Sequence, residues 1–157
     1  MSLQIVRTLY PPEHYVAQIA ELNRQLSPEA ALEHTQRRVR ALPKEDRILL
    51  AVEGDRLLGY AHIRVTRDLL SDEAAEVVTL AVAPDHRRKG VGRRLVHAAE
   101  AWARESGRSR LVLRTNVVVT AAHAFFVALG YAQAETSLVF VRDLEVERRA
   151  DQPTQPL

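Results

Sequence analysis

The segment that most constrains the fold is residues 77–92, VVTLAVAPDHRRKGVG. Its first half is an apolar run rich in β-branched residues, which predicts a strand over 76–82. Its second half is a short basic turn with two glycines, and the apolar stripe that follows predicts a helix to about Ser106. In such a strand–turn–helix unit, the unpaired N–H groups of the first helical turn point outward, next to the end of the strand.

This turn has the chemistry of an anion-binding loop. Gly90 can turn the backbone without a Cβ clash, and Gly92 allows a ligand to approach the backbone closely. The positive end of the helix dipole would stand behind them. Five basic residues surround the turn: Arg87, Arg88, Lys89, Arg93 and Arg94. The expected ligand is a polyphosphate.

Two common phosphate loops do not fit. No Lys-Ser/Thr pair follows the glycines, and the last position of a dinucleotide fingerprint is occupied by Leu95. Residues 87–92 instead resemble motif A of the GNAT acetyltransferase superfamily, Gln/Arg-x-x-Gly-x-Gly/Ala. The resemblance implies a loop that holds the pyrophosphate of acetyl-CoA.

Composition narrows the class of protein. The 157 residues are 46% hydrophobic and 27% charged, which is typical of one soluble domain. The absence of cysteine excludes disulfides, thiolate zinc sites and a cysteinyl acyl-enzyme. A net charge of +2 argues against a nucleic-acid partner, and the six histidines have no metal-ligand spacing. Without a membrane-length apolar run or a secretory pattern, a cytoplasmic location without membrane contact is expected.

The rest of the chain reads as alternating strands and helices. Ser27 is predicted to cap the second helix, and Gly54-Asp55 to turn one strand back on another. The further expected elements are a strand at 3–9, helices at 12–26 and from 28 to about 42, strands at 47–53, 57–66 and 110–114, a helix at 121–129 and a final strand at 137–142.

This order resembles the GNAT fold over residues 3–144. Residues 122–131 also resemble the superfamily's motif B, Ala-x-x-Phe/Leu-Tyr-x-x-x-Gly-Phe/Tyr. The resemblance implies an α/β (α+β) protein with a mixed, mostly antiparallel central sheet flanked by helices on both faces. One domain is expected over 1–144, with a disordered tail at 145–157.

The resemblance also assigns roles to residues. A bulge in the central strand would leave its backbone groups free for pantetheine and the thioester oxygen. The expected cofactor-binding residues are Leu80, Ala81, Val82, Arg87, Arg88, Lys89, Gly90, Val91, Gly92, Arg93 and Phe126. Glu76, six residues before Val82, is the candidate base.

The proton donor is where this chain departs from the superfamily. Phe126 stands where many members have a tyrosine near the CoA sulfur, and Val119 stands where many have an asparagine. Water, or His123 one turn earlier, remains open as the proton donor to the thiolate.

The sequence therefore predicts an acetyl-CoA-dependent N-acetyltransferase that works by direct attack of a primary amine in a ternary complex, without a metal. The acceptor is a small molecule or a peptide or protein amine, and a homodimer is compatible with the sequence. The alternative is a non-catalytic, regulatory acyl-CoA-binding module, which the loss of the motif B tyrosine keeps open.

Overall fold

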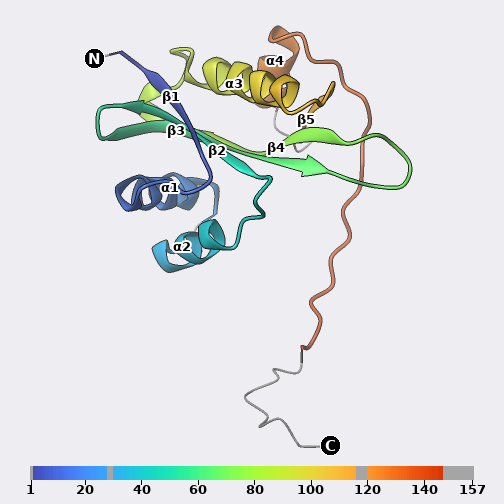
Figure 1. Cartoon of the computed structure of the whole chain (residues 1–157), viewed down its shortest axis with the longest axis horizontal. Helices are drawn as coiled ribbons and strands as arrows, with labels where there is room; N and C mark the ends of the chain where they lie inside the picture. The colour runs from blue at the N-terminus through green and yellow to red at the C-terminus, as the bar shows by residue number, and fades with distance from the viewer. Residues whose placement is uncertain (1, 28–29, 116–119, 147–157) are drawn as a thin grey trace, which may run out of the picture. The chain divides into compact units, whose positions relative to one another are not determined.

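The computed structural model describes residues 2–27, 30–115 and 120–146 (Figure 1). Compact units form over Met1–Val119 and Thr120–Leu157. The first unit contains β1 (Gln4–Thr8), α1 (Glu13–Leu26), α2 (Leu32–Arg40), β2 (Arg47–Glu53), β3 (Arg56–Thr66), β4 (Ala74–Val82), the 3₁₀ turn η1 (Pro84–His86), α3 (Val91–Glu105) and β5 (Leu111–Leu113). The second contains α4 (Thr120–Ala128).

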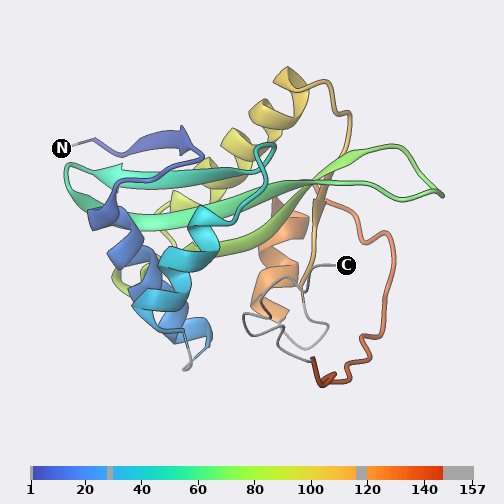
Figure 2. The same cartoon turned by 60° about the horizontal axis from the view of Figure 1, so that its bottom comes forward.

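A five-stranded sheet in the order β1-β2-β3-β4-β5 organises the first unit. The first three pairings are antiparallel, and β4 with β5 is parallel. Helices α1 and α2 cover one face and α3 the other, as Figures 1 and 2 show. The expected mixed sheet with helices on both faces is confirmed.

The sequence of β2 shows why both faces are covered. Its apolar run alternates between two cores: Ile48 and Leu50 pack on the α1 side, and Leu49 and Ala51 pack on the α3 side. A strand buried on both faces is expected to be continuously apolar, because neither face meets water. Trp102 of α3 is buried in the second of these cores.

Two turns of the first unit contain a glycine in the left-handed conformation, and the one at Gly54 was expected from the sequence. Gly54 (φ 57°) sits in the β2–β3 turn. Gly107 (φ 83°) follows α3, where the Arg108 N–H reaches back to the Ala103 carbonyl at 2.8 Å. Both positions need the left-handed conformation that glycine adopts without a steric cost.

Two expectations about elements are wrong. Ser27 ends α1, where its N–H donates to the Asn23 carbonyl, and α2 begins only at Leu32 after Ala31. Residues 137–142 form no strand. Leu138, Val139 and Phe140 there are 81–89% exposed, because no strand of the described chain pairs with this segment. The expected tail lies outside the described residues from 147 onward.

Candidate functional site

The loop between β4 and α3 has the geometry of an anion cradle. Gly90 is the N-cap of α3 with φ 84°, and within the described chain no side chain caps this helix. The first-turn N–H groups of α3 therefore remain available to a ligand, with the helix dipole behind them. Arg88, Lys89 and Arg93 are exposed around this turn.

Three arginines of the loop differ in what they contact. Arg87 donates from Nε to the carbonyl of Val82 at 3.2 Å, which ties the loop to the end of β4. Arg88 has φ 61°, a left-handed conformation that is costly for a residue with a Cβ and typical of functional loops. Arg94, expected at the mouth of the loop, instead donates to the carbonyl of Leu3 at 2.8 Å.

Strand β4 is irregular beside the cradle. Its register against β3 shifts between the pairs His62–Thr79 and Ile63–Val77, so Val78 is an extra residue in β4. Among the described residues, the ladder between β4 and β5 stops at Val77–Leu113. Beyond it the β5-facing backbone of Leu80–Val82 is unpaired by β5, and an extended ligand with amide groups can hydrogen-bond there.

Gly59 fixes how closely β3 approaches this part of β4. A Cβ at Gly59 would lie 2.7 Å from the Ala81 carbonyl oxygen and 3.2 Å from Cγ1 of Val91. Only glycine fits between the strand and the start of α3. Sequence reasoning missed this residue, although a glycine inside a strand signals a close backbone approach.

A cavity of about 490 Å³ opens on the other side of β4, between the sheet and the α1–α2 pair. Its lining residues are Ile19, Asn23, Leu26, Ser27, Ala30, His34, Thr35, Arg38, Val39, Leu42, Ile48, Tyr60, His62 and Thr79. Thr79 belongs to β4, one residue before Leu80, so the cavity reaches the strand on which a thioester would lie. This is room for a small acceptor molecule.

Tyr60 forms part of the cavity wall. Its hydroxyl hydrogen-bonds the side chain of Asn23 in α1. Burial raises the pKa of Tyr60 to about 12, so the phenol stays neutral at pH 7 and acts as a hydrogen-bond donor.

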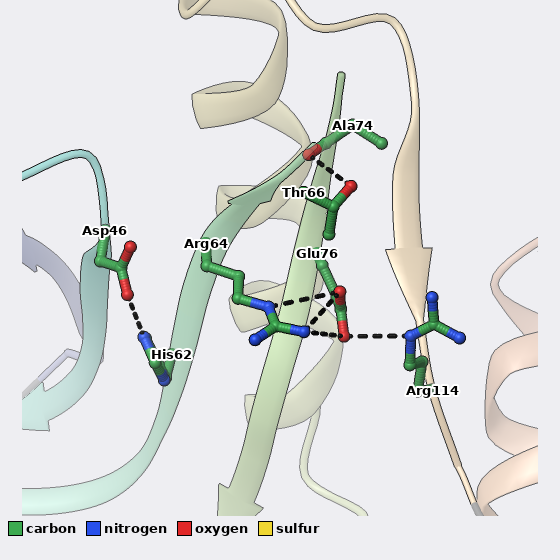
Figure 3. A network of polar contacts seen from close by, with 7 residues as sticks. All are labelled: Asp46, His62, Arg64, Thr66, Ala74, Glu76 and Arg114. Carbon is green, nitrogen blue, oxygen red and sulfur yellow. Dashed lines mark hydrogen bonds and ion pairs between the residues drawn. The ribbon is translucent and has the colours of Figure 1, made fainter. Parts of the chain in front are cut away.

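His62, on the same strand as Tyr60, pairs with a carboxylate from another part of the chain (Figure 3). Nε2 of His62 is 2.7 Å from Oδ2 of Asp46, the residue before β2. The Asp46 side chain is only 8% exposed, and that of His62 is 22% exposed where it lines the cavity. Sequence reasoning gave no role to His62 or to Tyr60.

Glu76, the base expected from the sequence, is 3% exposed. Figure 3 shows its carboxylate between two arginines: Arg64 Nη2 lies 3.3 Å from Oε2, and Arg114 Nε lies 3.2 Å from Oε1. Both oxygens accept hydrogen bonds from guanidinium groups. Glu76 is not among the described residues that line the cavity.

The motif B residues belong to the second unit. Phe126 is half-buried in α4, with its ring centroid 5.4 Å from that of Phe125. Gly130 (φ 92°) ends the helix, and the Tyr131 N–H donates to the Phe126 carbonyl at 3.1 Å. Val119 lies outside the described residues.

Two further observations concern ions and membranes. Within the described ranges, no three His, Asp or Glu side chains are grouped so that they could hold a metal ion. No helix in the described part of the chain has the length and apolar character to cross a bilayer.

Similar proteins define the class to which this fold and loop belong. The model of the acetyltransferase (GNAT) family matches residues 12–131. The chain is 30% identical over 106 residues to aminoglycoside N(6')-acetyltransferase type 1 of Stenotrophomonas maltophilia, which spans 64% of this chain and 69% of that protein. It is 40% identical over 99 residues to mycothiol acetyltransferase of Acidothermus cellulolyticus, which spans 62% of this chain but 28% of the relative.

A solved structure shows the same fold. The aminoglycoside acetyltransferase AAC(6')-Iy, in complex with the bisubstrate analog CoA-S-monomethyl-acetylneamine, superposes with a TM-score of 0.80 at 17% identity, covering 92% of this chain and 100% of that one. The chain belongs to the GNAT family of acetyltransferases, enzymes that transfer an acetyl group to an amine.

Proposed function

We propose that this protein transfers the acetyl group of acetyl-CoA directly to the primary amine of a small molecule. The observation that carries the proposal is the N-terminus of α3, which no described side chain caps, beside the part of β4 that β5 leaves unpaired among the described residues. The cradle would take the pyrophosphate, and the backbone of Leu80–Val82 would take pantetheine and orient the thioester carbonyl. Several relatives bind CoA or acetylate aminoglycosides, which supports this donor and an amine acceptor.

The expected base and acid fit this proposal unequally. Glu76 could accept the ammonium proton only after its arginine contacts give way, because each of its oxygens already accepts two hydrogen bonds from Arg64 and Arg114. Phe126 has no proton to give, so the proton of the departing thiolate would come from the amine nitrogen, from water or from His123. Cofactor binding requires no proton transfer at either position, and the Phe126 ring could still pack against pantetheine.

The first experiment is calorimetric titration with acetyl-CoA, followed by thiol release across a panel of amines that includes aminoglycosides, amino acids and a peptide N-terminus. We expect binding and turnover on a small amine. Binding without thiol release on any amine would favour the non-catalytic acyl-CoA-binding module. No binding would overturn the proposal.

Gly90→Asp should test the cradle directly. A carboxylate at the helix N-terminus would repel the pyrophosphate, and we expect acetyl-CoA affinity to fall by at least about 30-fold, or ~2 kcal/mol. Gly90→Asn is the matched control, because asparagine has the same shape, tolerates positive φ and carries no charge. Equal affinities for the two variants would contradict an anion site here.

A further inference from the structure

His62 and Asp46 form a pair that neither the family motifs nor the predicted site includes. Nε2 of His62 and Oδ2 of Asp46 are 2.7 Å apart, and the Asp46 side chain is almost fully withdrawn from water. The pair joins β3 to the turn before β2. The His62 side chain is therefore fixed at two points: its backbone lies in the sheet, and its ring contacts Asp46. His62 is also one of the residues that line the cavity.

This contact fixes which ring nitrogen can accept a proton. When Nε2 donates its hydrogen to the Asp46 carboxylate, Nδ1 is the ring nitrogen left to accept a proton. No described residue hydrogen-bonds Nδ1, and the atom is not sealed from solvent. We propose that His62 is the general base for the acceptor amine and that Asp46 positions it. This inference rests on the acetyltransferase function proposed above.

The position of His62 along β3 suits this role. His62 is the register partner of Thr79, which lines the cavity and precedes Leu80. An amine in the cavity would therefore meet the imidazole on one side and the β4 backbone on the other. Glu76 is the register partner of Arg64, which lies two residues after His62 on β3. The carboxylate oxygens of Glu76 contact two arginines, and Glu76 is not among the described cavity-lining residues.

The step balances with the groups present. One proton of the acceptor ammonium moves to Nδ1 of His62, and the imidazolium is stabilised by the Asp46 carboxylate. The amine lone pair forms the C–N bond with the thioester carbonyl carbon, and the C–S bond then breaks. A second nitrogen proton ends on the CoA thiolate, and the imidazolium returns its proton to solvent.

The test uses His62→Gln, because glutamine can still donate to Asp46 and keep the contact. On the amine that the wild type acetylates fastest, we expect kcat to fall by about 10²–10⁴-fold, with acetyl-CoA affinity unchanged by calorimetry. His97→Gln is the control, since His97 is 59% exposed on α3. Retention of kcat within threefold in His62→Gln would overturn the inference while leaving the proposed function intact.

Two further measurements separate a positioned base from a structural histidine. Asp46→Asn should lower kcat, and the double variant should be no slower than His62→Gln alone, because the two residues act as one unit. Added imidazole should restore part of the kcat of His62→Ala. Additive losses without rescue by imidazole would mean that His62 is a structural residue and would overturn the inference. If Glu76→Gln loses activity and the basic limb of the pH profile while His62→Gln keeps both, the base is Glu76. A wild type that acetylates no amine would refute the proposed function and this role together.

Discussion

Two glycines determine the backbone geometry of the candidate site, one where β3 approaches β4 and one where α3 begins. Gly59 lets β3 lie against the Ala81 carbonyl and the start of α3, and Gly90 lets the chain enter α3 without a cap. Neither residue offers a side chain to a ligand. Their contribution is to the geometry of the backbone that a cofactor would contact.

Gly59→Ala should therefore affect binding as well as stability. The added Cβ would meet a carbonyl oxygen at 2.7 Å, so β4 must shift. We expect a loss of about 1–3 kcal/mol in the free energy of unfolding and weaker acetyl-CoA binding, by roughly tenfold. Gly107→Ala is the control: its Cβ would meet open space, and its φ of 83° alone should cost about 1 kcal/mol without changing affinity. Unchanged binding in Gly59→Ala would contradict this account.

At the scale of elements, the hairpin of β3 and β4 carries an exposed cluster of ion pairs. Arg67 contacts Glu45 at 2.7 Å and Glu73 at 2.9 Å, and Arg108 contacts Glu73 at 3.0 Å. Hydrogen bonds from Arg108 and then Arg67 hold the pKa of Glu73 below its usual value of 4.5, and the bond from Arg67 does the same for the pKa of Glu45.

This cluster predicts a loss of stability in acid. A carboxylate whose pKa is lower in the folded state than in the unfolded chain stabilises the fold above the unfolded value. That stabilisation is lost as the pH falls from about 4.5 through the folded pKa. The urea midpoint of Glu73→Gln should therefore fall less steeply with acid than that of the wild type. Glu33→Gln, which removes a carboxylate without a described ion pair, should keep the wild-type slope; equal slopes for all three would count against the cluster.

For the whole molecule, the charge around the cavity bears on the choice of acceptor. Its described lining includes Arg38 and two histidines but no carboxylate. Arg38 makes no ion pair within the described chain. A polycationic aminoglycoside would gain little from such a wall, whereas an amine that also carries a carboxylate could pair with Arg38.

We therefore expect higher kcat/KM for an amino acid than for the matching amine without its carboxylate. Arg38→Gln should reduce this preference by about tenfold or more, mainly through KM, because a charge-assisted hydrogen bond is lost. Arg37→Gln, on the adjacent exposed position outside the cavity lining, should retain it. If the wild type and Arg38→Gln both prefer aminoglycosides to amino acids, Arg38 does not recognise a carboxylate of the acceptor.

The sequence by itself predicted the glycine turn that opens α3, the strand β2 and the order of elements through α4. Each depends on local physics: glycine at positive φ, the dipole of a helix end, and periodicity along one segment. The resemblance of residues 87–92 and 122–131 to family motifs then predicted the family correctly.

Only the tertiary structure decided which groups meet. His62 and Asp46 are 16 residues apart, and Glu76 meets an arginine 38 residues away, so neither contact has a sequence pattern. Residues 137–142 have the composition of a strand, yet a strand exists only where another backbone pairs with it. For the same reason, the end of the β4–β5 ladder within the described residues and the reach of the cavity to Thr79 follow from the packing of the sheet, which no single segment encodes.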